Sequence, residues 1–357
     1  MTSRAGRPLR VGLLGYGLGG RVFHAPLVAA TPGLELAAVV TRDPERRAQL
    51  RAAHPGAAAL DTPEALLGMR ETIDLVVVCT PNRSHAPLAR AALEAGLPVV
   101  VDKPFATSAA AARELAALAR ARGLLLTVFQ NRRWDGDFLT VRRLVEEGAL
   151  GEVRRLESRF ERWSPAARVG WKESADPEDG GGLLLDLGSH LVDQALVLLG
   201  PASGVYAELD RRRPGSAVDD DVFLALRHAS GARSHLWMSR VAAQGGPRFR
   251  VLGETSAFTK HGLDGQEPAM AAGGVPGSPG WGEEPPARWG RLGLEDSAVP
   301  VPTVPGAYQR FYTGVAAALR GEGPAPVDPM GAVAALEVLE AARRSAASGR
   351  VEPVGPA

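Results

Sequence analysis

One apolar segment of the sequence carries polar side chains at the spacing of an α-helix. Residues 180–200 read GGGLLLDLGSHLVDQALVLLG and contain Asp186, His190 and Asp193. Residues three or four apart project from the same side of a helix, so we expect these groups to form one stripe. Such a stripe could transfer protons, but a buried hydrogen-bonded network would leave the same pattern. A metal site is the weaker interpretation, because an Asp and a His without a nearby cysteine make an incomplete ligand set.

A glycine-rich turn near the N-terminus is typical of nucleotide binding. Gly15, Gly17 and Gly20 match G-x-G-x-x-G between an apolar run and a helical pattern. In this motif one glycine makes the turn, one lets the pyrophosphate approach, and one allows the helix to pack closely on the strand. A chain with 42 glycines produces chance matches, but the position after the first predicted strand favours dinucleotide binding over a structural turn.

The residues after the second apolar run bear on which dinucleotide binds. NAD-dependent proteins usually place an acidic side chain there for the ribose hydroxyls, whereas NADP-dependent proteins place an arginine against the 2′-phosphate. Here Thr41 and Arg42 come first, and Asp43 stands where it could cap the next helix. We therefore expect NADP(H) to be preferred, with NAD(H) as the second option. The alternative for Arg42 is a solvated surface arginine.

Polar residues also end two later apolar runs, at the edge where ligands collect in open α/β sheets. The stretch CTPNRSH would place Pro81 and Asn82 beside the cofactor, and VDKPFA would point Lys103 into the crevice. For Lys103 the alternative is an ordinary exposed lysine, and for His85 a capping or structural role is the stronger interpretation. The residues predicted to line the cofactor site are Gly15, Gly17, Leu18, Gly20, Thr41, Arg42, Thr80, Pro81, Asn82, His85, Asp102 and Lys103.

A third polar stretch, FQNRRWDGDF, offers candidates for substrate binding. Asn131, Arg132 and Trp134 combine hydrogen-bonding groups with an aromatic face, which suits a polyhydroxylated ring. A Trp134 that covers the core between two domains is an equal alternative.

The elements that would position these residues follow from the apolar runs. Near-continuous apolar runs at residues 9–15, 34–40, 73–80, 97–103 and 124–130 predict parallel strands that are buried on both faces. Alanine-rich helical patterns separate the later runs. Alternating strands and helices predict an α/β fold with a doubly wound parallel sheet, a Rossmann domain over residues 1–130.

The pattern changes after about residue 135. Longer runs at residues 152–163, 219–239 and 248–260 predict strands joined by tight turns, in a large and mostly antiparallel open sheet. Glycine and proline dominate residues 262–305, which predicts a long loop or flap. We assign residues 131–330 to an α+β domain for substrate binding and oligomerisation. Residues 331–357 form a C-terminal helix and tail that could pack back on the first domain.

Composition excludes few classes but is consistent with the motifs. The 357 residues include 41 Lys and Arg against 40 Asp and Glu, so no basic surface indicates nucleic acid or an anionic membrane. A lone cysteine, Cys79, cannot form an internal disulfide, which is typical of a cytoplasmic protein. No run has the length of a membrane span, and the N-terminal region lacks the apolar core of a signal peptide.

Five stretches together resemble one family. GYGLGGRVFHAP, TPNRSH, DKPFA, NRRWDGDF and GGLLLDLGSHLVDQ are similar, in order, to motifs of the glucose-fructose oxidoreductase, inositol dehydrogenase and rhizopine catabolism (Gfo/Idh/MocA) family. The resemblance implies a Rossmann domain followed by an α/β domain whose open sheet often serves for oligomerisation. The family's catalytic lysine falls on Lys103, and its Asp-x-x-x-His pair falls on Asp186 and His190. Asp102 departs from the family's usual glutamate, which draws that carboxylate back by one methylene.

Within the family the chain is most similar to NADP-preferring scyllo-inositol dehydrogenases. The resemblance implies a dehydrogenase of CH–OH groups whose substrate is a small polyol or sugar. His190 would act as the base, Asp186 would orient its ring or share the substrate hydroxyl, and Lys103 would stabilise the alkoxide. Three alternatives are a non-enzymatic NAD(P)-binding regulator, an NAD-dependent glycosidase, and a reductase of imines or pigments. We expect a homodimer or homotetramer.

Overall fold

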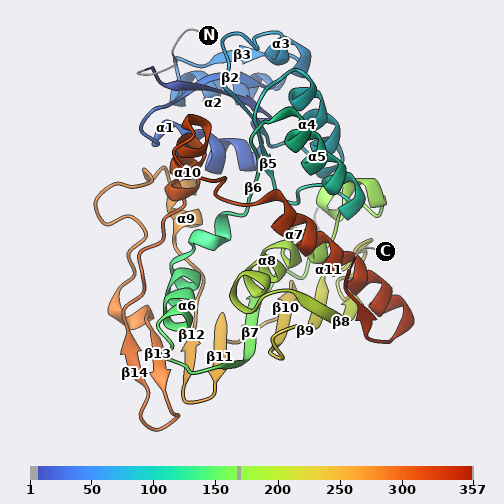
Figure 1. Ribbon diagram of the computed structural model, residues 1–357, viewed down its shortest axis with the longest axis vertical. Coiled ribbons are helices and arrows are strands. Elements are labelled where there is room, and N and C mark those ends of the chain that lie inside the picture. Colours follow the sequence, from blue (N-terminus) through green and yellow to red (C-terminus); the bar gives the residue numbers. More distant parts are fainter. Residues whose placement is uncertain (1–6, 167–169, 356–357) are drawn as a thin grey trace.

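Two β-sheets organise the computed structural model, which describes residues 7–166 and 170–355 (Figure 1). The first sheet has six parallel strands in the order β3-β2-β1-β4-β5-β6, which is the doubly wound order that the apolar runs predict. Its strands are β1 (Leu9–Leu14), β2 (Leu34–Val40), β3 (Ala58–Leu60), β4 (Leu75–Val78), β5 (Val99–Asp102) and β6 (Leu126–Phe129). The short β3 at the edge was not predicted.

Five α-helices and a short π-helix belong to this sheet. The π-helix η1 (Gly19–His24) follows the glycine-rich turn. Asp43 caps α2, because its carboxylate accepts the Arg46 N–H at 3.0 Å, and Ser108 caps α5 in the same way. The α-helices are α1 (Ala25–Ala29), α2 (Pro44–Ala53), α3 (Pro63–Leu67), α4 (His85–Glu94) and α5 (Ala109–Arg122).

The second sheet has nine strands and is mostly antiparallel, as expected. Its order is β14-β13-β12-β11-β7-β10-β9-β8-β15, and only β7 and β10 pair in parallel among the described strands. The strands are β7 (Val153–Glu161), β8 (Ala202–Asp210), β9 (Asp221–His228), β10 (Arg233–Ser239), β11 (Phe249–Gly253), β12 (Ala257–Lys260), β13 (Gly290–Gly293), β14 (Val299–Val301) and β15 (Glu352–Pro353).

The expectation of a long loop or flap over residues 262–305 misses three regular elements. This segment forms the helix α9 (Gln266–Ala271) and the two edge strands β13 and β14, which extend the sheet beyond β12. Both strands are very short and contain glycine or proline, so they show no alternation that could be recognised. Gly290 is required by packing, because a Cβ there would lie 2.2 Å from the Phe258 ring.

Residues 180–200 form two helices instead of one. α7 (Leu183–Asp186) ends before Leu187, and α8 (Gly188–Leu199) then turns away; the stretch Pro177–Asp186 and α8 meet at a bend of 58°. The polar residues therefore do not share one straight stripe. In the described ranges no single helix is long and apolar enough to cross a membrane; only this bent pair, extended back to Pro177, reaches that length and composition together.

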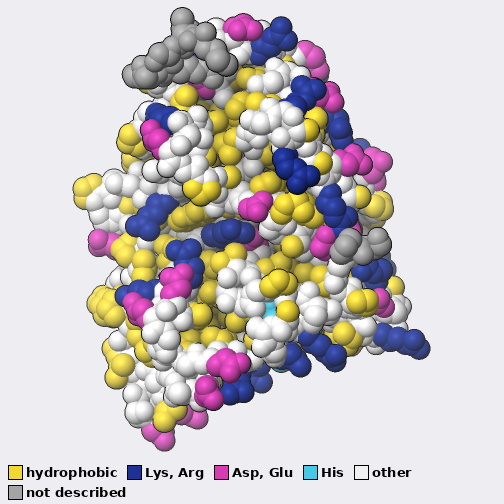
Figure 2. All heavy atoms as spheres, viewed as in Figure 1, with side chains coloured by type: hydrophobic (Ala, Val, Ile, Leu, Met, Phe, Trp, Pro, Cys, Tyr) yellow, Lys and Arg dark blue, Asp and Glu magenta, His cyan; other side chains and the backbone are white. Residues whose placement is uncertain are grey.

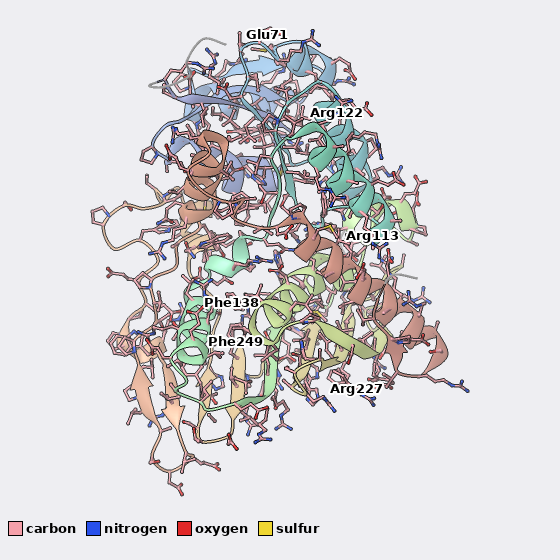
Figure 3. The ribbon with its side chains drawn as sticks, viewed as in Figure 1. Glu71, Arg113, Arg122, Phe138, Arg227 and Phe249 are labelled. Atoms are coloured by element: carbon pink, nitrogen blue, oxygen red, sulfur yellow. The ribbon has the colours of Figure 1, made fainter. Side chains whose placement is uncertain are left out.

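Three further helices pack around the two sheets. α6 (Gly136–Glu146) packs on the second sheet, where Phe138 faces Phe249 with ring centroids 6.4 Å apart (Figure 3). α10 (Gln309–Arg320) packs on α1, and α11 (Pro329–Ser348) contacts α5, α8 and β8. The limits of the domains stay a prediction.

Figure 2 shows several Lys and Arg side chains across the middle of the visible face.

Candidate active site

The glycine-rich turn is closely packed on one side and open on the other. Gly15 has φ +103°, and a Cβ there would lie 2.3 Å from the Cys79 carbonyl oxygen. A Cβ on Gly20 would lie 2.3 Å from the Gly15 carbonyl oxygen, whereas one on Gly17 would meet nothing within 4 Å. Leu18 is exposed. The turn thus leaves room above Gly17 for a pyrophosphate, and the residues present fit a dinucleotide.

At the end of β2, Arg42 presents a charged group with unbonded terminal nitrogens. Thr41 is buried and donates its N–H to the Leu60 carbonyl, and Asp43 is occupied as the cap of α2. The Arg42 Nε donates to the Asp61 carbonyl at 3.0 Å, and its terminal nitrogens make no hydrogen bond within the described chain. These nitrogens could contact a phosphate.

The stretch after β4 contributes structural contacts as well as candidates for cofactor binding. Asn82 is buried and donates to the Gly180 carbonyl at 3.1 Å, which connects this edge to the start of the α7 region. Both ring nitrogens of His85 lie 2.8 Å from backbone carbonyls, of Thr80 and of Pro104. No ring nitrogen of His85 is left for a cofactor, so the structure gives this residue the structural role. Pro81 begins the turn after Thr80 and is exposed.

Asp102 ends β5 and is held from three sides. Its Oδ1 accepts the Lys103 N–H at 2.8 Å, and its Oδ2 lies 3.2 Å from Cys79 Sγ and 3.6 Å from His24 Nε2. The Nδ1 of His24 lies 2.6 Å from the Tyr312 hydroxyl. Although burial opposes ionisation, the contact with His24 keeps the pKa of Asp102 well below its usual range. Asp102 is one methylene shorter than the family's usual glutamate, and its carboxylate lies against the backbone N–H of Lys103.

Lys103 and Asp186 meet between the two sheets. The Lys103 ammonium donates to the Asp186 carbonyl at 2.7 Å and to its Oδ1 at 2.9 Å. Both side chains are largely but not completely buried, with exposed fractions of 16% and 14%. The end of a parallel strand thus contacts the last residue of α7, 83 positions away, as the family resemblance requires.

Two further cations surround the same carboxylate. Lys172, in the 3₁₀ turn η4 (Trp171–Glu173), donates to Asp186 Oδ1 at 2.7 Å. Arg240, directly after β10, lies 3.6 Å from Asp186 Oδ2. Burial opposes ionisation of Asp186, but Lys103 and Lys172 outweigh it and hold its pKa far below the usual range. The carboxylate is therefore charged at neutral pH.

His190 lies in the first turn of α8 and is buried. Its Nδ1 has no hydrogen-bond partner among the described residues, and its ring packs edge-on to Phe160 at 6.5 Å. Burial, followed by the positive charges of Lys103 and Arg132, lowers the pKa of His190 well below its ordinary value. The imidazole is therefore neutral near pH 7, with one buried nitrogen that needs a partner.

Asp193 does not join this group. Its carboxylate forms two hydrogen bonds with the Arg133 guanidinium, at 2.8 and 2.6 Å, and is buried. The structure thus brings Lys103, Asp186 and His190 into one region and gives Asp193 to a separate ion pair.

The predicted substrate loop is the 3₁₀ turn η3 (Asn131–Trp134). Asn131 is buried, and Trp134 packs edge-on against Phe311 of α10, which favours the packing alternative for Trp134. Arg132 donates to the Tyr308 hydroxyl at 2.9 Å and forms an ion pair with Glu267 of α9. Arg132 is therefore fixed by two segments that follow it in the chain by more than a hundred residues.

Several residues of the region gave no signal in the sequence. Lys172 and Arg240 lie in a loop and at a strand end, with no motif around them, and they reach Asp186 only through the fold. Glu267 and Tyr308 come from the segment expected to be a loop and from the residue before α10. Only a contact map could have identified them.

This geometry can remove a proton from a hydroxyl group. A neutral imidazole with a free nitrogen can accept the proton, and an ammonium group beside it can stabilise the resulting alkoxide. The open glycine-rich turn belongs to the same edge of the parallel sheet, where a dinucleotide would bind.

Comparisons with known proteins agree with the fold and the motifs. Residues 9–130 match the family model described as an oxidoreductase family with an NAD-binding Rossmann fold, and residues 138–259 match the GFO/IDH/MocA C-terminal domain. The chain is 41% identical to the uncharacterized oxidoreductase YdgJ of Escherichia coli, over 95% of this chain and 96% of that protein.

A second curated relative has a named activity. The scyllo-inositol 2-dehydrogenase (NADP(+)) IolW of Bacillus subtilis is 32% identical, over 94% of this chain and 93% of its own length. Among solved structures, an oxidoreductase from Klebsiella pneumoniae superposes with a TM-score of 0.89 at 38% identity, covering 99% of this chain and 96% of that one.

Proposed function

Because the chain belongs to the Gfo/Idh/MocA family of NAD(P)-binding oxidoreductases, we propose that it transfers a hydride between NADP(H) and the CH–OH carbon of a cyclitol or sugar. Scyllo-inositol and related cyclitols are the first candidates, since the relative IolW is named for that substrate and for NADP(+). The D-glucoside 3-dehydrogenase of Escherichia coli, 34% identical over 54% of this chain, extends the candidates to sugars.

The observation that carries this proposal is the grouping of Lys103, Asp186 and His190. His190 Nδ1 is buried without a partner among the described residues, and the imidazole lies within the electrostatic influence of the Lys103 ammonium, which is held by the Asp186 carboxylate. Most buried polar atoms of a structural network are paired, so the unpaired imidazole in this region favours a ligand-binding role.

Each of these residues has a defined part in the reaction. When bound, the nicotinamide supplies the hydride acceptor at the carbinol carbon. The His190 imidazole takes the hydroxyl proton, and the Lys103 ammonium stabilises the negative charge on the oxygen. Asp186 holds Lys103 in place through two hydrogen bonds from the ammonium, at 2.7 and 2.9 Å, and stays ionised throughout.

The preference for NADP(H) rests on the end of β2. Arg42 offers unbonded terminal nitrogens there, while the carboxylate of Asp43 is turned into the cap of α2. A 2′-phosphate could therefore contact a cation with no acidic side chain in the position that repels it.

The test is a panel of inositols and aldoses assayed with NADP⁺ and with NAD⁺ by the absorbance of the reduced nicotinamide. We expect turnover of at least one cyclitol or sugar, with a higher kcat/KM for NADP⁺. Binding of NADPH without turnover of any member would favour the regulator alternative. Product formation without net change of the nicotinamide would favour the glycosidase alternative.

A further inference from the structure

We propose that the active site also contains an anion subsite, formed by Lys172 and Arg240, that binds a carboxylate or phosphate group of the substrate. This inference rests on the proposed function, since it takes Lys103 and His190 as the place where the hydroxyl reacts. It narrows the substrate class to cyclitols or sugars that carry a negative charge.

The charges in contact with Asp186 are all positive. This single carboxylate contacts three cations: Lys103 at 2.9 Å, Lys172 at 2.7 Å and Arg240 at 3.6 Å. Asp186 is ionised and contributes one negative charge. The three cations that contact Asp186 carry more charge than this one carboxylate, and Asp102 and Glu173 supply further negative charge nearby.

The neighbouring acidic groups are already engaged. Glu173 and Asp220 both pair with Arg213, at 2.7 and 3.0 Å. Arg162 lies close enough to Arg240 to add a further positive charge. Two carboxylates thus share Arg213, and Glu173 also acts on Arg240, but among the described residues no carboxylate lies within hydrogen-bond distance of the Arg240 guanidinium.

The Arg240 guanidinium has unused hydrogen-bonding capacity. Among the described residues its only close carboxylate is Asp186, at a distance of 3.6 Å that is too long for a hydrogen bond. The Arg240 side chain is 12% exposed. It is therefore largely enclosed by its neighbours, and a small part of its surface stays accessible to a ligand. A planar guanidinium with free donors is the group that binds carboxylates and phosphates in a bidentate manner.

Lys172 complements Arg240 as a mobile partner. Its side chain is 47% exposed although its ammonium touches Asp186, so it can turn from Asp186 to a ligand without crossing the core. A bound anion would place negative charge between the Lys172 ammonium and the Arg240 guanidinium. The distance from the subsite to Lys103 is set by Asp186, which contacts all three cations.

Matched substrate pairs test the inference. The probes are D-glucose with D-glucuronate, D-galactose with D-galacturonate, and D-glucose with D-glucose 6-phosphate, each at saturating NADP⁺. We expect kcat/KM to be about 10- to 100-fold higher for the anionic member of at least one pair, the factor for one charge-assisted hydrogen bond. The carboxylate and phosphate arms distinguish the two anions. The preference should decrease as the salt concentration rises.

Variants locate the effect. In Lys172→Gln and Arg240→Gln the ratio of anionic to neutral kcat/KM should fall about tenfold or more, mainly through KM for the anionic substrate. The control is Arg154→Gln, which removes one positive charge from an exposed pair at the opposite end of β7 and should leave the ratio unchanged. Equal or higher kcat/KM for the neutral members in the wild type would overturn the inference while leaving the proposed function intact.

Binding gives a readout that does not depend on turnover. If no pair is turned over, calorimetric titration of the complex with NADPH compares glucuronate, glucose 6-phosphate and glucose, because NADPH fills the sites for nucleotide phosphates. Tighter binding of an anion that is lost in Arg240→Gln supports the subsite. Binding of glucose and the anions with equal affinity contradicts it, and a chain that does not bind NADPH contradicts the proposed function itself.

Discussion

His190 is a buried histidine with one ring nitrogen left for a ligand. In His190→Ala we expect kcat to fall by about 10²- to 10⁴-fold while the affinity for NADP(H) stays nearly unchanged, because proton transfer is lost and the glycine-rich turn is untouched. The measurements are turnover, cofactor affinity and melting temperature on one preparation.

His228 provides the matched control. It is also buried, but its two nitrogens contact the Gly200 carbonyl and the Ser234 hydroxyl at 2.8 and 2.7 Å. His228→Ala should reduce stability by about 1 to 3 kcal/mol with little effect on kcat. If His190→Ala instead resembles this control and keeps wild-type turnover, its role is structural.

The pH dependence of oxidation tests the surroundings of His190. Burial and the charges of Lys103 and Arg132 lower its pKa, so the neutral base should persist below pH 6.5 and the acidic limb of kcat/KM should lie below that value. Lys103→Met removes one positive neighbour. The pKa of His190 then rises, and the limb should move to higher pH while kcat falls. A limb that stays in place in Lys103→Met would exclude His190 as the group that titrates.

Arg42 is expected to determine the choice of nucleotide. Arg42→Ala should lose about 1.5 to 3 kcal/mol of selectivity for NADP over NAD, the range of one charge-assisted hydrogen bond. Ratios of kcat/KM for the two cofactors measure it. Arg51→Ala, an exposed arginine in the last turn of α2, is the control and should not change the ratio. A wild type that prefers NAD would contradict the assignment.

At the scale of the elements, the start of α7 decides where Asp186 lies. The Asp219 carboxylate accepts the Leu184 N–H at 2.6 Å and lies so close to Gly182 that a Cβ there would meet Oδ1 at 2.2 Å. Asp219→Ala should cost about 0.5 to 2 kcal/mol of stability, as for the loss of a helix cap, and should also lower kcat because Asp186 shifts.

Asp328→Ala is the control for this element. Asp328 caps α11 with a hydrogen bond of 2.9 Å from the Met330 N–H, away from the candidate active site. It should lose a similar amount of stability in thermal unfolding and keep its kcat. Equal kcat in both variants would mean that the cap of α7 has no effect on the site.

The elements differ in how far the sequence predicts them. Buried parallel strands are recognisable because continuous apolar runs are needed on both faces of the sheet, and five of the six strands were found in this way. β3, β13 and β14 have only three or four residues and depend on pairing with a neighbour. The break at Leu187 was missed, because the apolar residues and the polar spacing continue through it.

The candidate site divides in the same way. Lys103, Asp186 and His190 stand in local motifs, so family resemblance could place them. Lys172 and Arg240 reach Asp186 from a loop and a strand end, and their partner is known only once the chain has folded. Ion pairs between residues that come from separate elements leave no characteristic spacing in the sequence.

For the whole molecule, the second sheet bears on assembly. Phe223, His235 and Trp237 lie together on one face of β9 and β10 and are only partly buried, with the rings of Phe223 and Trp237 5.2 Å apart. Partly exposed aromatic groups on a broad sheet usually contact a partner. We propose that two or four chains associate through this face.

Light scattering at micromolar concentration tests the association. The mass should be two or four times that of one chain, and Phe223→Glu should lower it. The control is Val299→Glu on the exposed edge strand β14, which should not change it. A single-chain mass for the wild type would contradict the proposal.

α11 also bears on how the molecule can move. Its Glu340 accepts the Ala109 N–H of α5 at 2.7 Å, and its Ser345 hydroxyl accepts the Ala207 N–H of β8 at 3.0 Å. Its Glu337 pairs with Arg113, which lies beside α11 (Figure 3). The single helix α11 is thus bonded both to α5, which packs beside the first sheet, and to β8 of the second sheet. Hinge bending between the sheets would break these bonds, so nucleotide exchange is expected to depend on short segments instead. α9 packs on η1 and is tied to Arg132 through Glu267, so we expect it to move when the nucleotide is released.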